Sequence, residues 1–127
     1  MFEVFFYWED AMNRRYSLKK NEDIKGVLNH QHKRFCHGIG VFVKPNPSVA
    51  DFRIAFSVPK KYGNAAKRNH LKRRLREVVR TFNIKSKQDI FVMVRPDYKP
   101  QTFEDLTRTL HTCFTQLKLI GENDDQS

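Results

Sequence analysis

The spacing of apolar and polar residues changes along the chain, and each spacing predicts an element. Three segments follow the helical period of about 3.6 residues, in which apolar side chains recur three or four positions apart. We expect helices just after Asn21, over residues 65–82 and over residues 103–119. We expect strands over residues 38–44, 52–58 and 89–95, and the second of these alternates strictly.

The pattern also assigns side chains to faces. The bulky face of the strand 52–58 carries Phe52, Ile54, Phe56 and Val58, and its other face carries the small residues Ala55 and Ser57. The central helix has a core-facing stripe of Leu71, Leu75, Val78, Val79 and Phe82. The resulting order, α-β-β-(β)-α-β-α with the bracketed strand optional, predicts an α+β protein in which helices pack on a small mixed sheet.

Length and local composition predict the domain organisation. The 127 residues suffice for one domain with one core. Residues 1–13 are acidic and aromatic, unlike the basic stretch that follows, so we expect an atypical N-terminal extension; a translation start at Met12 is one hypothesis for it. Residues 14–119 form the single domain, and residues 120–127 are an acidic tail that we expect to be disordered.

The net charge narrows the class of partner. The chain carries 24 Lys and Arg against 14 Asp and Glu, a formal charge of +10, which favours RNA, DNA or anionic lipid. Five Gly, five Pro and two Cys exclude collagen-like, low-complexity and disulfide-scaffold proteins. The cysteines lack CxxC spacing, and the N-terminus resembles neither a signal peptide nor a spanning helix. We therefore expect a cytoplasmic protein with no membrane partner.

Most of this charge lies in residues 60–80. Nine of these 21 residues are Lys or Arg, and only Glu77 is acidic. Arg68, Lys72 and Arg76 recur at i, i+4 and i+8, and with the apolar stripe buried we expect one continuous outward basic ridge. Neighbouring like charges on a helix repel, so such a ridge is destabilising unless a polyanion neutralises it. The segment therefore predicts a helix that binds nucleic acid.

A longer sequence string surrounds this helix. It comprises Lys60, Lys61, Gly63, Asn64, Ala65, Arg68, Asn69, Lys72, Arg73, Arg76 and Glu77. This string resembles the signature of the bacterial ribonuclease P protein family. The agreement extends to Arg15, to residues 18–23, to the strand 53–58 before the helix and to residues 89–96 after it. It covers residues 14–119, and the combination of strand, Gly-Asn turn and basic helix makes it specific.

The resemblance implies a protein subunit of the ribonucleoprotein that removes the 5′ leader from precursor tRNA. In that family the RNA subunit, with bound Mg²⁺, hydrolyses the phosphodiester, so no catalytic side chain and no dedicated metal site are expected in the protein. The implied partners are the catalytic RNA subunit and precursor tRNA, without a required protein partner. The family fold also implies a left-handed β-α-β crossover, an exception to the usual hand.

Two groups of residues correspond to the binding surfaces of the family. The basic helix and its approach are expected to bind RNA through Lys60, Lys61, Asn64, Lys67, Arg68, Asn69, His70, Lys72, Arg73 and Arg76. The leader cleft, between the first helix and the sheet, is expected to include Lys20, Ile24, Leu28, Phe42, Ser57 and Val94. Two interpretations of Phe42 stay open: it stacks on a leader base, or it belongs to the core.

Four positions depart from the family pattern. His70 stands where Arg is usual, so a cationic donor there depends on pH. Ile24 and Leu28 stand where Phe is frequent, which removes two possible stacking surfaces. Gly40 stands in a central strand where a larger apolar residue is common.

Three other hypotheses share part of this evidence. A non-enzymatic RNA-binding protein, such as a ribosomal protein with a basic helix as an RNA clamp, would share the charge but not the flanking strands. A stand-alone ribonuclease would cut RNA by itself, but the histidines lack the spacing of metal ligands and no carboxylates pair convincingly. A basic helix on a membrane surface is disfavoured because the apolar face has only the width that a globular core needs.

Overall fold

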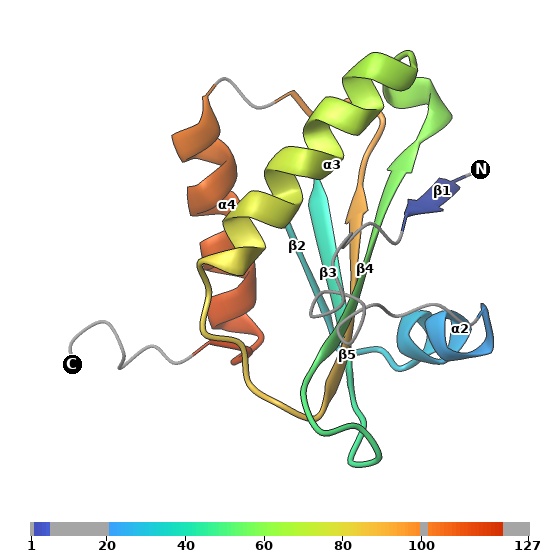
Figure 1. Cartoon of the computed structure of the whole chain (residues 1–127), viewed down its shortest axis with the longest axis vertical. Helices are drawn as coiled ribbons and strands as arrows, with labels where there is room; N and C mark the ends of the chain where they lie inside the picture. Colours follow the sequence, from blue (N-terminus) through green and yellow to red (C-terminus); the bar gives the residue numbers. More distant parts are fainter. Residues whose placement is uncertain (1, 6–20, 100–101, 121–127) are drawn as a thin grey trace.

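The computed structural model describes residues 2–5, 21–99 and 102–120 (Figure 1). Its strands are β1 (Phe2–Phe5), β2 (Lys33–Cys36), β3 (Ile39–Pro45), β4 (Arg53–Pro59) and β5 (Gln88–Val94). Its helices are α2 (Asn21–Asn29), α3 (Ala65–Arg80) and α4 (Phe103–Gln116), with a 3₁₀ turn at Lys60–Tyr62. None of these helices is long and apolar enough to cross a membrane.

The strands form one mixed sheet in the order β1-β4-β5-β3-β2. β4 and β5 are parallel neighbours, and α3 provides the long crossover that a parallel pair requires. The other neighbouring pairs in this sheet are antiparallel. The predicted α+β class, with helices packed on a small mixed sheet, is confirmed.

Alternation along the strands gives the sheet two faces with different cover. α3 and α4 pack on one face, where Ile54, Phe56 and Val58 of β4 join the main core. α2 packs on the other face, where Ala55 belongs to a smaller buried cluster. Figure 1 shows α2 set apart from the pair formed by α3 and α4. The two faces predicted for residues 52–58 are therefore correct.

The sequence pattern does not predict β1 and β2. β2 pairs with β3 at one end of the sheet, and its residues are exposed except for the half-buried Cys36, so they show no apolar alternation. β1 pairs with β4 at the opposite end and lies within the expected extension. The rest of that extension and residues 121–127 of the tail lie outside the described residues.

The predicted helix boundaries need small corrections. α2 begins at Asn21 itself, whereas the sequence predicts that Asn21 is the cap residue just before the helix. α3 ends at Arg80, because Thr81 closes the last turn through its hydroxyl, which donates to the Val78 carbonyl at 2.7 Å. Phe82, expected within α3, still packs on the core against Phe114, with 5.3 Å between ring centroids. α4 ends at Gln116, three residues before the expected end.

Candidate nucleic-acid interface

The start of α3 presents its first cations to solvent. The 3₁₀ turn Lys60–Tyr62 leads from β4 into the helix, and Lys60 and Lys61 are exposed. Asn64 caps α3, since its Oδ1 accepts a hydrogen bond from the backbone N–H of Lys67 at 2.9 Å. The predicted cap is confirmed. The positive end of the helix dipole adds to the attraction for anions at this end.

The outward side of α3 is polar and basic. Leu71 and Leu75 face the core, and Asn69 and Arg73 are exposed on the opposite side. Along one flank, Lys67 and His70 are also exposed. The Nε2 atom of His70 accepts a hydrogen bond from Arg74 Nε at 3.1 Å. We name the exposed residues Lys60, Lys61, Lys67, Asn69, His70 and Arg73 the α3 ridge.

The predicted ridge is wrong in one respect, because it included Arg68, Lys72 and Arg76 as outward cations. Lys72 is fully buried, and Arg68 and Arg76 are half-buried. At about 3.6 residues per turn, these three positions run along the border of the buried stripe rather than opposite it. The i, i+4, i+8 spacing therefore identified one line of cations correctly but not the direction in which that line faces.

Phe42 is a buried residue on the sheet face that α2 covers. Only 6% of it is exposed, and it shares a cluster with Ile24 and Phe91. Its ring meets that of Phe91 in an edge-to-face arrangement with 6.3 Å between centroids. The Lys33 ammonium lies 5.9 Å from the Phe42 ring centroid. Of the two interpretations of Phe42, this burial favours the core.

The other residues expected in the leader cleft fall into three groups. Leu28 and Ser57 lie on the α2 face; Leu28 is half-buried, and the buried Ser57 hydroxyl has no hydrogen-bond partner among the described residues. Val94 is fully buried in the main core on the opposite face, and Met93 packs on the α2 face instead. Successive side chains of a strand point to opposite faces, so the prediction of Val94 on the α2 face was wrong by one residue. Lys20 lies outside the described residues.

Sequence reasoning missed an aromatic residue on this face. Phe35 of β2 pairs with Gly40 of β3, and its ring packs edge-on against Phe42 with 5.7 Å between centroids. Phe35 is 47% exposed. A Cβ atom at position 40 would lie 2.5 Å from the Phe35 ring, which explains the unusual Gly40. Gly40 itself is the signal that could have identified this pair, because a glycine inside a strand often marks the close approach of another group.

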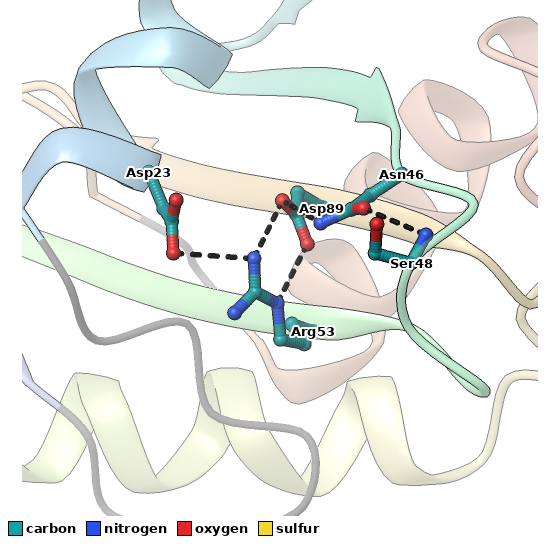
Figure 2. Close-up of polar contacts among 5 residues, drawn as sticks. All are labelled: Asp23, Asn46, Ser48, Arg53 and Asp89. Carbon is teal, nitrogen blue, oxygen red and sulfur yellow. Dashed lines mark hydrogen bonds and ion pairs between the residues drawn. The ribbon is translucent and has the colours of Figure 1, made fainter.

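A polar network fixes α2 and the β3–β4 loop to the sheet (Figure 2). Asp89 at the start of β5 accepts two hydrogen bonds from Arg53, each at 2.8 Å, and a third from Asn46 at 3.0 Å. Arg53 also pairs with Asp23 of α2 at 3.3 Å. The pKa of Arg53 is raised, chiefly by its hydrogen bond with Asp89. The network joins residues from α2, β4 and β5 at the edge of the α2 face.

A family model described as Ribonuclease P matches residues 12–118. The ribonuclease P protein component of Phytoplasma australiense is 30% identical over 114 residues, covering 88% of this chain and 99% of that protein. The component from Bacillus pumilus (strain SAFR-032) is 30% identical over 118 residues, covering 91% of this chain and 99% of that protein.

Solved structures of RNase P proteins are also similar to the fold of this chain. A Staphylococcus aureus RNase P protein mutant with defective mRNA degradation activity matches with a TM-score of 0.79 and 30% identity, covering 86% of this chain and 93% of that chain. The Thermotoga maritima RNase P protein in complex with 1-(4-fluorophenyl)-2-thiourea matches with a TM-score of 0.67 and 25% identity, covering 82% and 99%. The fold, the basic helix after β4 and these matches together show that the chain belongs to the ribonuclease P protein family.

Proposed function

We propose that this protein assists ribonuclease P by binding two RNAs on two different surfaces. The α3 ridge binds the catalytic RNA subunit, and the sheet face next to α2 binds the 5′ leader of precursor tRNA. The observation that carries this proposal is the placement of exposed cations and an exposed aromatic ring on opposite sides of one sheet. Such an arrangement lets one small protein contact both RNAs at the same time.

Exposed cations support the assignment of the α3 ridge to a large structured RNA. Lys60, Lys61 and Arg73 are all exposed and carry no ion pair among the described residues. Phosphates attract such side chains without regard to sequence, and each contact releases counterions. We therefore expect the ridge to contribute affinity and orientation, not sequence preference.

One exposed ring and nearby cations support the assignment of the α2 face to a single-stranded RNA. Phe35 offers a ring on which a base can stack, and Lys33 and Lys44 are exposed on the same face. The Lys44 Nζ lies beside Gly26 of α2, at the border of this face. Stacking surfaces bordered by cations are typical of proteins that bind single-stranded RNA.

The Mg²⁺ of the family's reaction belongs, in this proposal, to the RNA subunit and its substrate, where it activates water and neutralises developing charge. Within the described ranges 2–5, 21–99 and 102–120, no group of three or more His, Cys, Asp or Glu side chains is gathered as a metal site requires. The protein's own contribution is to bind and orient the leader next to the RNA subunit.

Cleavage of precursor tRNA by the reconstituted complex tests this function. The protein should raise cleavage by the RNA subunit most strongly at low Mg²⁺ and should not cut precursor tRNA alone. If the protein binds RNA but gives no stimulation at any Mg²⁺ concentration, the RNA-clamp hypothesis replaces the proposal. If the protein alone cuts RNA in the presence of a chelator, it is a stand-alone ribonuclease.

A further inference from the structure

A groove between α3 and α4 borders the α3 ridge and shares Lys67 and His70 with it. Its volume is about 690 Å³, within the range of pockets that hold small organic groups. The flank of α3 opposite Lys72 forms one wall, with Lys67, His70 and Arg74, and the start of α4 forms the other with Phe103. Lys99 and Tyr98 complete it from the segment after β5.

The groove combines positive charge with an accessible aromatic ring. Phe103 is 39% exposed, and the Arg74 guanidinium lies 5.2 Å from its ring centroid. Lys67 and Lys99 are exposed, and no carboxylate occurs among the described residues that line the groove. A neighbouring pocket of about 450 Å³ shares Tyr98 but contains Asp97 and Asp105, so its charge is mixed. Of these two pockets, the groove at α3 is therefore better suited to an anion.

Tyr98 adds an unused hydrogen-bonding group. The residue is 7% exposed, and its hydroxyl has no hydrogen-bond partner among the described residues. A buried polar group without a partner is destabilising unless a bound molecule satisfies it. Burial raises the pKa of Tyr98 to about 12, so the hydroxyl is protonated at neutral pH and can donate.

We infer that this groove binds one unpaired nucleotide of the RNA subunit. The base stacks on the exposed Phe103 ring, the Tyr98 hydroxyl donates to an acceptor of the base or sugar, and Lys67 and Lys99 contact the flanking phosphates. The combination of an aromatic ring, a guanidinium plane and cations favours a splayed-out base over a paired helix, whose bases are stacked and inaccessible. This inference rests on the proposed function and names the RNA element that binds beside the α3 ridge.

Affinity for transcripts of the RNA subunit, measured against salt concentration, tests the inference. Phe103→Ala removes stacking and should lower affinity roughly 5- to 150-fold without changing the salt dependence. Tyr98→Phe should lower it roughly 2- to 10-fold. Lys99→Ala removes the groove cation that lies outside the α3 ridge and should reduce the log–log salt slope by about 0.7–0.9. Phe35→Ala is the matched control, an exposed Phe on the leader face, and should leave this affinity unchanged.

Two further measurements separate the possible outcomes. Because Phe103 is partly exposed, the melting temperature of Phe103→Ala should fall by about 3 °C or less. Phe103→p-benzoylphenylalanine, irradiated in the full complex, should crosslink to an unpaired nucleotide of the RNA subunit. Wild-type affinity in both Phe103→Ala and Tyr98→Phe, or a crosslink to paired nucleotides or to precursor tRNA, would overturn the inference. Failure of the wild-type protein to bind the RNA subunit would instead overturn the proposed function.

Discussion

Phe35 and Phe42 pack edge to face on one side of the sheet, yet burial gives them different roles. Phe42 is enclosed by α2 and the neighbouring strands, so its ring is not available to a base. Phe35 is half-exposed beside it and rests on the bare backbone of Gly40. We therefore propose that Phe35, and not Phe42, stacks on a leader base, and that Phe42 supports the Phe35 ring from within the core.

Truncation of each ring separates these roles. Phe35→Ala should weaken binding of precursor tRNA by about 1–3 kcal/mol, spare mature tRNA and change the melting temperature little, because stacking on a leader base is lost. Phe42→Ala should instead lower the free energy of unfolding by about 3–5 kcal/mol, because it opens a cavity in the smaller core. The measurements are affinity for tRNA with and without its leader and a denaturant titration. Leader-specific loss in Phe42→Ala but not in Phe35→Ala would reverse the assignment.

Among the elements, α2 is joined to the sheet by apolar packing of Ile24 and Val27 and by the ion pair of Asp23 with Arg53, which also binds Asp89. Asp89→Asn removes the charge from a largely buried carboxylate and should lower the free energy of unfolding by about 2 kcal/mol. Asp105→Asn is the matched control, because its ion pair with Arg108 is exposed, and it should cost less than about 1 kcal/mol. Urea denaturation of both variants makes the comparison. Equal losses would show that the buried network stabilises the fold no more than an exposed ion pair does.

The raised pKa of Arg53 determines the pH range over which the guanidinium stabilises the fold. A cation whose pKa is raised on folding contributes its full stabilisation below its unfolded pKa and loses it only as pH rises through the higher folded value. The guanidinium therefore stays charged, and its contribution is constant, throughout the neutral range.

The α3 ridge is the second element whose function can be isolated. Arg73 points away from the core at an exposed position, so Arg73→Ala should leave the circular dichroism spectrum native. It should weaken binding of RNA-subunit transcripts and reduce the log–log salt slope by about 0.7–0.9. Glu77→Gln removes the one acidic side chain of this helix, at another exposed position, and should strengthen binding. An unchanged affinity and slope in Arg73→Ala would exclude the ridge as the RNA-subunit surface.

At the scale of the whole molecule, the sequence predicts what depends on local periodicity. The alternation in residues 52–58 assigns both faces of β4 correctly, and Asn64 is recognisable as a cap from its position before a helical pattern. β2 shows no such pattern because its side chains are mostly exposed. The burial of Lys72 also escapes prediction, since it depends on packing along the border of the stripe.

The candidate site was predictable to a similar extent. The motif from Lys60 to Glu77 identifies the basic helix from sequence, because its residues are contiguous, but it does not show which of the cations face outward. The α2 face combines residues from α2, β2 and β3 that are far apart along the chain, so only the fold shows that Phe35 lies over Gly40. The groove at Phe103 likewise requires α3 and α4 to meet.

The central claim, that two surfaces bind two different RNAs, is tested most directly by photocrosslinking in the complete complex. p-Benzoylphenylalanine is placed once at Arg73 on the α3 ridge and once at Phe35 on the α2 face, with RNA subunit and precursor tRNA both present. The account predicts that the probe at position 73 crosslinks to the RNA subunit and the probe at position 35 to the 5′ leader. Crosslinks from both positions to the same RNA, or exchange of the two targets, would contradict it.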